Sequence, residues 1–166
     1  MRPYIIILFS FVSSAAICQK PCGCSISNKG ESIVQLIDSL QTNQLRTFNK
    51  KRFIPKFIKK ALECWVGKFD IANPGKRYRA TDLVTWDSKS LPARQLTYLG
   101  LNDHYMILAY KKGGRAASFN VIIVEFANQS ILNAWAGGGV RLSSQEEVLY
   151  ILKNQRDILQ WGNFNL

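Results

Sequence analysis

The chain contains one histidine, His104, and it has 11 acidic residues against 22 basic ones. A catalytic Ser-His-Asp or Cys-His system would have to use His104. Asp103 is its neighbour in sequence, but adjacent side chains on a strand point to opposite faces. The sequence also lacks the G-x-S-x-G, H-E-x-x-H and P-loop motifs. These absences disfavour a histidine-based hydrolase, a zinc peptidase and a nucleotide-binding enzyme.

The residues that the chain does contain allow three other kinds of site: a carboxylate pair, a Cys-His dyad and a metal site. Paired carboxylates can run hydrolysis, but no spacing singles out a pair among Asp82, Asp87, Asp103 and Glu125. A Cys64/His104 dyad, or a metal site that joins the cysteines to His104, is a further arrangement to weigh. The Cys-x-Cys spacing of Cys22 and Cys24 is tighter than that of most structural zinc sites. We therefore expect no metal and no cofactor.

The first residues follow the order of a secretory signal peptide. A positive start, Met1-Arg2, precedes an apolar run over residues 3–12 and small residues over residues 13–16. The run is shorter than the roughly 20 residues of a membrane-spanning helix. The alternative is a buried N-terminal strand. We predict a signal peptide over residues 1–18, cut before Ile17 or Gln19, and an exported protein, periplasmic or secreted, with no transmembrane helix in the mature chain.

The position of the cut decides how many cysteines the mature protein keeps. The later cut removes Cys18 and leaves three of the four. A lipoprotein anchored at Cys18 is a further alternative, although an isoleucine precedes it where a small residue is normally needed. In an oxidising compartment we expect a disulfide between Cys64 and either Cys22 or Cys24. It would close a loop of about 40 residues and stabilise the fold by about 3–4 kcal/mol.

Behind a Cys-containing tail over residues 19–28, residues 29–166 are predicted to form a single domain. Apolar residues at helical spacing predict helices over about residues 29–41, 55–66 and 144–159. Ser143 and Ser144 ahead of Glu146 and Glu147 form a capping pattern at the start of the third helix.

Between the last two helices the apolar period changes to two. It predicts strands over residues 95–100, 104–110, 116–126 and 131–136, with a further strand near residues 78–85. Short turns such as Asn128-Gln129 join sequence neighbours. We therefore predict an α+β fold: an antiparallel β-meander of four to five strands, preceded by two helices and followed by a C-terminal helix packed on the sheet, with the helices on one face. A strongly curled sheet around a helix is the alternative.

Most of the excess positive charge lies in one segment. Residues 46–79 contain eleven basic and two acidic residues, so this segment carries +9 of the formal charge of +11. Ten of the basic residues form our candidate anion-binding site: Arg46, Lys50, Lys51, Arg52, Lys56, Lys59, Lys60, Lys76, Arg77 and Arg79. The helix over residues 55–66 is apolar on one face, as a core-facing helix usually is, and basic on the other. Closely spaced like charges repel one another, and an anionic partner would relieve that repulsion.

These features favour an exported, non-enzymatic basic binding module that engages an anionic envelope or extracellular ligand through residues 46–79. The expected partners are an anionic lipid, a glycan or an acidic protein. Nucleic acid is disfavoured because no nucleic-acid-binding motif accompanies the charge and because the protein is exported. Two alternatives stay open: a small secreted hydrolase that uses carboxylates or His104, and a structural cell-envelope protein of unknown role.

Overall fold

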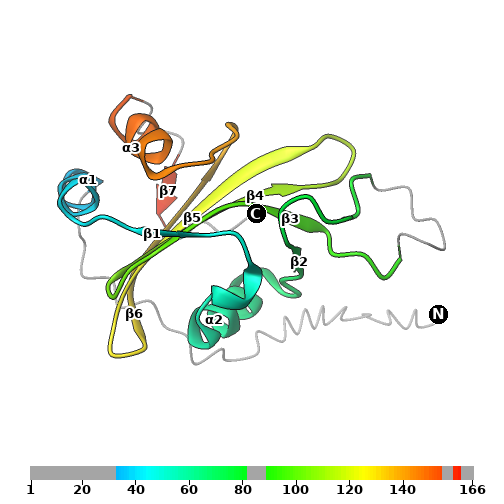
Figure 1. The fold of residues 1–166 in the computed structure, drawn as a ribbon, viewed down its shortest axis with the longest axis horizontal. Helices are drawn as coiled ribbons and strands as arrows, with labels where there is room; N and C mark the ends of the chain where they lie inside the picture. The colour runs from blue at the N-terminus through cyan, green and yellow to red at the C-terminus, as the bar shows by residue number, and fades with distance from the viewer. Residues whose placement is uncertain (1–32, 82–88, 155–158, 162–166) are drawn as a thin grey trace, which may run out of the picture.

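A computed structural model describes residues 33–81, 89–154 and 159–161 of the chain (Figure 1). The predicted signal peptide and Cys-containing tail lie outside these residues. The elements, in chain order, are α1 (Ile33–Thr42), β1 (Arg46–Phe48), the 3-10 helix η1 (Lys51–Phe53), α2 (Lys56–Val66), β2 (Ile71–Ala72), β3 (Arg94–Leu101), β4 (Tyr105–Lys112), β5 (Ser118–Ala127), β6 (Ser130–Gly138), α3 (Gln145–Asn154) and β7 (Leu159–Trp161).

The strands form one sheet with the order β1-β3-β4-β5-β6-β7, and β2 pairs with β3 beside β1. Strands β3 to β6 are the predicted antiparallel meander. The β2–β3 pair is parallel. Asn128 and Gln129 both have positive φ at the β5–β6 turn, which suits a two-residue hairpin turn because its twist matches that of the flanking strands. The predicted α+β fold, with two helices before the meander and one after it, is confirmed.

No sequence pattern predicts the short strands β1, β2 and β7, which have only two or three residues each. Strands of this length cannot show a period of two. Our prediction that the third helix runs to Leu159 was wrong: α3 ends at Asn154, and Leu159 pairs with Gly137 in the β6–β7 ladder. This ladder satisfies backbone groups of β6 that would otherwise lie at the edge of the sheet. An apolar residue in phase with a helix can therefore belong to a strand that follows it.

The strand predicted near residues 78–85 is absent from residues 78–81, and residues 82–88 lie outside the described part. The Arg79 N–H donates to the Pro92 carbonyl (2.8 Å), and the Gly114 N–H donates to the Ala80 carbonyl (3.3 Å). These isolated bonds fasten the segment to the ends of β3 and β4. They satisfy its backbone without a strand ladder.

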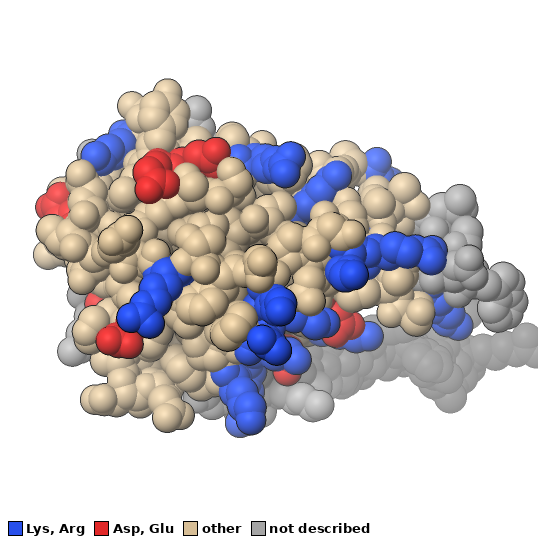
Figure 2. Space-filling model, viewed as in Figure 1, with Lys and Arg blue, Asp and Glu red and all other residues tan. Residues whose placement is uncertain are grey.

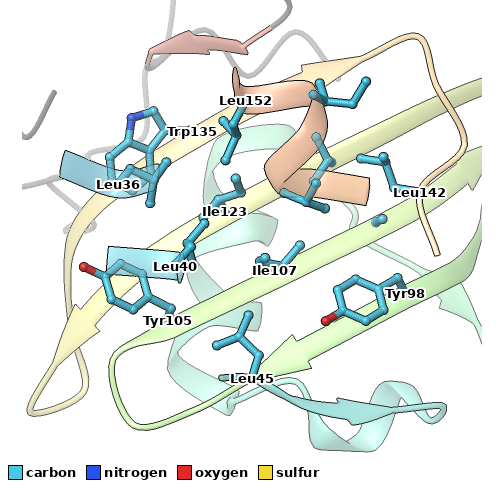
Figure 3. Packing of buried hydrophobic residues seen from close by; sticks show 14 of the residues in the cluster. Leu36, Leu40, Leu45, Tyr98, Tyr105, Ile107, Ile123, Trp135, Leu142 and Leu152 are labelled. Atoms are coloured by element: carbon cyan, nitrogen blue, oxygen red, sulfur yellow. The ribbon is translucent and has the colours of Figure 1, made fainter. Parts of the chain in front are cut away.

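The helices cover both faces of the sheet, so our prediction that they lie on one face was wrong (Figure 1). Helices α1 and α3 pack on the face that carries Tyr105, Ile107, Ile123 and Trp135 (Figure 3). Helix α2 packs on the other face, where Ile58 and Leu62 meet the alternate residues of the same strands. All of Tyr105–Tyr110 is buried as a result. An unbroken apolar run in a strand is typical of a sheet covered on both faces.

The N-terminus of α3 is capped in the way the sequence predicts. The Glu147 N–H donates to the Ser144 hydroxyl (3.2 Å), and the Ser143 hydroxyl donates to the Glu147 carboxylate (2.9 Å). Side chains thus satisfy donors of the first turn.

Gln145, the first residue of α3, joins that helix to α1. Its side-chain amide donates to the carbonyls of Leu40 (2.6 Å) and Asn43 (3.1 Å), and its oxygen accepts from the Leu45 N–H (3.0 Å). These bonds satisfy backbone groups where α1 ends and the chain turns toward β1. One side chain therefore fixes how the two helices meet.

We expect Gln145→Ala to lower the free energy of unfolding by about 2 kcal/mol, because it leaves three backbone groups, two of them part-buried, without their partner. Chemical denaturation monitored by tryptophan fluorescence measures this loss. Gln41→Ala is the matched control: Gln41 is exposed on α1, and the change should alter stability by less than about 0.5 kcal/mol. Equal effects of the two substitutions would contradict the role given to Gln145.

Two buried tyrosines make the fold sensitive to alkali. Burial raises the pKa of Tyr98 and of Tyr110 above the ordinary value of 10.0. The unfolded chain therefore loses these protons first, and stability falls as the pH rises above about 10. Burial and the Arg94 charge lower the pKa of Lys112 below its ordinary value of 10.5. The folded protein therefore loses this proton before the unfolded chain does, so this lysine makes stability rise with pH, but only up to about pH 10.5.

Above pH 10.5 we therefore expect the tyrosine effect to dominate, so that stability falls as the pH rises. Denaturation measured from pH 9 to pH 12 tests this. Tyr110→Phe should flatten the slope, whereas Tyr150→Phe, at a side chain that is 64% exposed, should not. Identical slopes in the two variants would contradict this account.

Candidate functional site

A hollow of about 250 Å³ lies where η1, the start of α2 and β2 meet. Four cationic residues, one carboxylate and three apolar residues line it: Lys51, Arg52, Lys56, Lys59, Asp70, Ile54, Phe69 and Ile71. The four cations are exposed, while the apolar residues are at most 7% exposed. The site, called here the basic hollow, therefore has a cationic rim and an apolar floor.

The local backbone explains this arrangement. Lys50 and Ile54 are extended on either side of the single 3-10 turn of η1. The turn leaves Lys51 and Arg52 in solvent, and Ile54 enters the core of the α2 face. Helix α2 follows with Ile58 buried and its lysines exposed. The amphipathic pattern predicted for this helix therefore holds, and its apolar face belongs to the core.

Asn73 connects the η1 turn of the basic segment to the turn that follows β2. Its side-chain oxygen accepts the Lys51 N–H (2.8 Å), and its backbone carbonyl accepts the Lys76 N–H (3.1 Å). Residues 25 positions apart in sequence are thereby held beside one residue. The η1 turn and the turn after β2 are neighbours in space for this reason.

The acidic residues of the segment are already engaged. Glu63 pairs with Lys59 (3.6 Å) and Asp70 pairs with Lys68 (2.7 Å). Among the described residues, no carboxylate lies within 4 Å of the side-chain nitrogens of Lys51, Arg52 or Lys56. The first turn of α2 also carries no acidic residue and no side-chain cap. No described acidic group therefore offsets the charges of these three side chains or the positive N-terminal end of the α2 dipole.

The ten candidate residues do not all meet at the hollow. Lys51, Arg52, Lys56 and Lys59 line it. The others are not part of its lining and lie on β1, before η1, on α2 and after β2: Arg46, Lys50, Lys60, Lys76, Arg77 and Arg79. All of these are exposed except Arg79, which is half-buried. Figure 2 shows Lys and Arg side chains gathered over the η1 and α2 region and extending toward the segment after β2.

The sheet adds basic residues that sequence reasoning did not include in the site. Arg94 lies opposite Lys112 in the β3–β4 ladder, and Lys111 lies beside it. The Lys111 ammonium sits 5.8 Å from the centre of the Tyr78 ring, so the turn after β2 rests against β4. The excess of basic residues at the ends of β3 and β4 was visible in the sequence, but their closeness to residues 76–79 depends on the fold.

Arg94 is buried, at 5% exposure, under the basic segment. Its guanidinium lies 4.7 Å from the centre of the Phe69 ring and 5.7 Å from that of Tyr110. It donates to the Lys68 carbonyl (3.2 Å). Stacking on aromatic rings offsets part of the cost of burying a cation. Arg94 therefore holds Phe69, part of the floor of the hollow, against the sheet.

Within the described residues, no side-chain hydrogen bond or ion pair joins His104, Asp103 and Glu125 to one another. His104 and Asp103 are exposed in the β3–β4 turn. Glu125 accepts a hydrogen bond from the Asn133 amide. Cys64 is half-buried on α2 and is not a free thiol. Asp82 and Asp87, like Cys22 and Cys24, lie outside the described residues.

The described part of the chain holds no group of three or more His, Cys, Asp or Glu side chains placed to bind a metal ion. None of its helices has the length and apolar character needed to cross a membrane.

Comparison of the chain with known proteins finds no matching family model, no matching curated protein and no matching solved structure. The basic hollow and its surroundings are therefore the features that point to a function.

Proposed function

We propose that this protein is an exported, non-enzymatic binding module that engages an anionic ligand of the envelope or the extracellular space through the basic hollow. The observation that carries the proposal is the set of three rim cations, Lys51, Arg52 and Lys56, that no described carboxylate neutralises. Phosphate, sulfate and carboxylate groups are the ligands that such a cluster binds.

The size and floor of the hollow limit the kind of ligand. A volume of about 250 Å³ is at the lower end of small-molecule sites, so it suits one charged head group or one acidic sugar rather than a large ligand. The surrounding cations, among them Lys50 and Lys60, extend the positive surface beyond it. The ligand is therefore the anionic part of something larger: an anionic lipid, a glycan or an acidic protein.

Export and the disulfide belong to the same proposal. The signal-peptide pattern of residues 1–18 supports secretion into an oxidising compartment, and the engaged state of Cys64 supports a bridge to Cys22 or Cys24. Such a bridge would fasten the tail over residues 19–28 to α2, which carries two of the rim lysines.

A binding panel with the mature protein tests the function. The panel contains heparin, polyglutamate and phosphatidylglycerol vesicles, each beside a neutral counterpart: dextran, polyglutamine and phosphatidylcholine vesicles. We expect binding to at least one anionic member that weakens at least tenfold between about 50 and 500 mM salt, because salt screens exposed charges. Binding that salt leaves unchanged, or equal binding to the neutral counterparts, would contradict the proposal.

A further inference from the structure

One exposed aromatic side chain lies between the rim cations in the sequence. Phe53, the last residue of η1, is 38% exposed and is one of the four large apolar residues exposed in the described part of the chain. Lys50, Lys51 and Arg52 precede it, and Lys56 follows at the start of α2. The other three exposed apolar residues, Val34, Val140 and Tyr150, lie on or beside α1 and α3.

The surroundings of Phe53 favour insertion of the ring over stacking. The Phe48 ring lies 4.6 Å from it, centre to centre, and the Arg52 guanidinium lies 5.1 Å from its centre. These contacts take up ring surface on which a sugar or a base would stack. They also hold the ring in place, so that its exposed part projects from a short, fixed turn.

A partly exposed aromatic ring that contacts Arg52 and lies between lysines in the sequence matches the chemistry of an anionic bilayer surface. Aromatic residues sit at the boundary between head groups and acyl chains, and neighbouring cations bind the lipid phosphates. The floor of the hollow, including Phe69 and Ile71, is already buried and offers little apolar surface of its own. The apolar part of the contact must then come from Phe53.

We propose that η1 docks the protein on an anionic phospholipid surface, with Phe53 inserted among the lipids and one head group in the basic hollow. This inference rests on the proposed function and names the lipid as its ligand. It assigns two separate tasks: the rim cations bind phosphate, and Phe53 supplies the apolar contact.

Co-sedimentation with vesicles tests the role of Phe53. Vesicles of phosphatidylcholine with about 30% phosphatidylglycerol are compared with pure phosphatidylcholine, and heparin binding is measured in parallel. We expect Phe53→Ala to weaken binding to the anionic vesicles about tenfold and to leave heparin binding unchanged, since only the bilayer takes up the ring. Phe53→Leu should keep most of the vesicle binding. Tyr150→Ala, which removes a more exposed ring from α3, should have no effect.

Four outcomes would overturn the inference. Vesicle binding of Phe53→Ala at the wild-type level would show that the ring does not insert. An equal loss of heparin and vesicle binding in this variant would mean that Phe53 shapes the hollow instead. Heparin binding without vesicle binding in the wild-type protein would make a glycan the ligand and leave the proposed function standing. Failure to bind any anion would contradict both this inference and the proposed function.

Discussion

Replacing both Arg52 and Lys56 with glutamine should lower the affinity for an anionic surface about 30-fold at low salt. Both side chains line the basic hollow, and no described carboxylate pairs with either. Each basic residue near an anionic lipid surface contributes about 1 kcal/mol to binding, so the loss of two amounts to about 2 kcal/mol. Co-sedimentation with phosphatidylglycerol-containing vesicles at two salt concentrations measures the change.

The matched control removes the same charge from another part of the molecule. Arg141 and Lys153 are exposed before and at the end of α3, on the opposite side of the sheet from α2. Arg141→Gln combined with Lys153→Gln should weaken binding less than threefold. If both double variants lose affinity equally, net charge rather than the hollow determines binding, and the assignment of the site is wrong.

Replacing Cys64 with serine should lower the free energy of unfolding by about 3–4 kcal/mol. The expected bridge to Cys22 or Cys24 closes a loop of about 40 residues, and its loss restores the conformational freedom of the unfolded chain. The wild-type protein in reductant should fall to the stability of the variant. Of Cys22→Ser and Cys24→Ser, the substitution at the bridged position should have the same effect as Cys64→Ser.

Mass spectrometry under non-reducing conditions supplies the direct check on this bridge. A peptide from residues 19–28 should remain linked to the peptide that contains Cys64. If the Cys64 thiol reacts with iodoacetamide in the folded, unreduced protein, or if reductant leaves stability unchanged, the prediction of the disulfide is wrong. The case for an oxidising compartment then weakens.

The long elements and the meander pairing of the four long strands could be predicted from the sequence, and the short strands and the placement of the helices on two faces could not. The four long strands and three helices follow from apolar spacing because each has eight or more residues. The helix positions on two faces were missed, although the unbroken apolar run at residues 105–110 was a usable sign. The strands β1, β2 and β7 are specified by their partners, which a local pattern cannot contain.

The candidate site, too, could be predicted only in part from the sequence. The sequence located the charge between residues 46 and 79 but could not say which cations share a surface. That grouping depends on Asn73, whose side chain accepts the Lys51 N–H, and on the acids that neutralise Lys59 and Lys68. The sequence places Phe53 next to basic residues but does not show that the ring is exposed. Its exposure follows from the 3-10 turn that turns it outward while Ile54 enters the core.

Amine labelling of the mature protein, with and without bound anionic vesicles, tests the central claim most directly. Lysines are acetylated in the folded state and the modified positions are quantified by mass spectrometry. The account predicts that vesicles protect Lys51, Lys56 and Lys59 at least fivefold, while Lys153 on α3 is labelled as before. Equal protection of all four lysines, or protection of Lys153 alone, would contradict it.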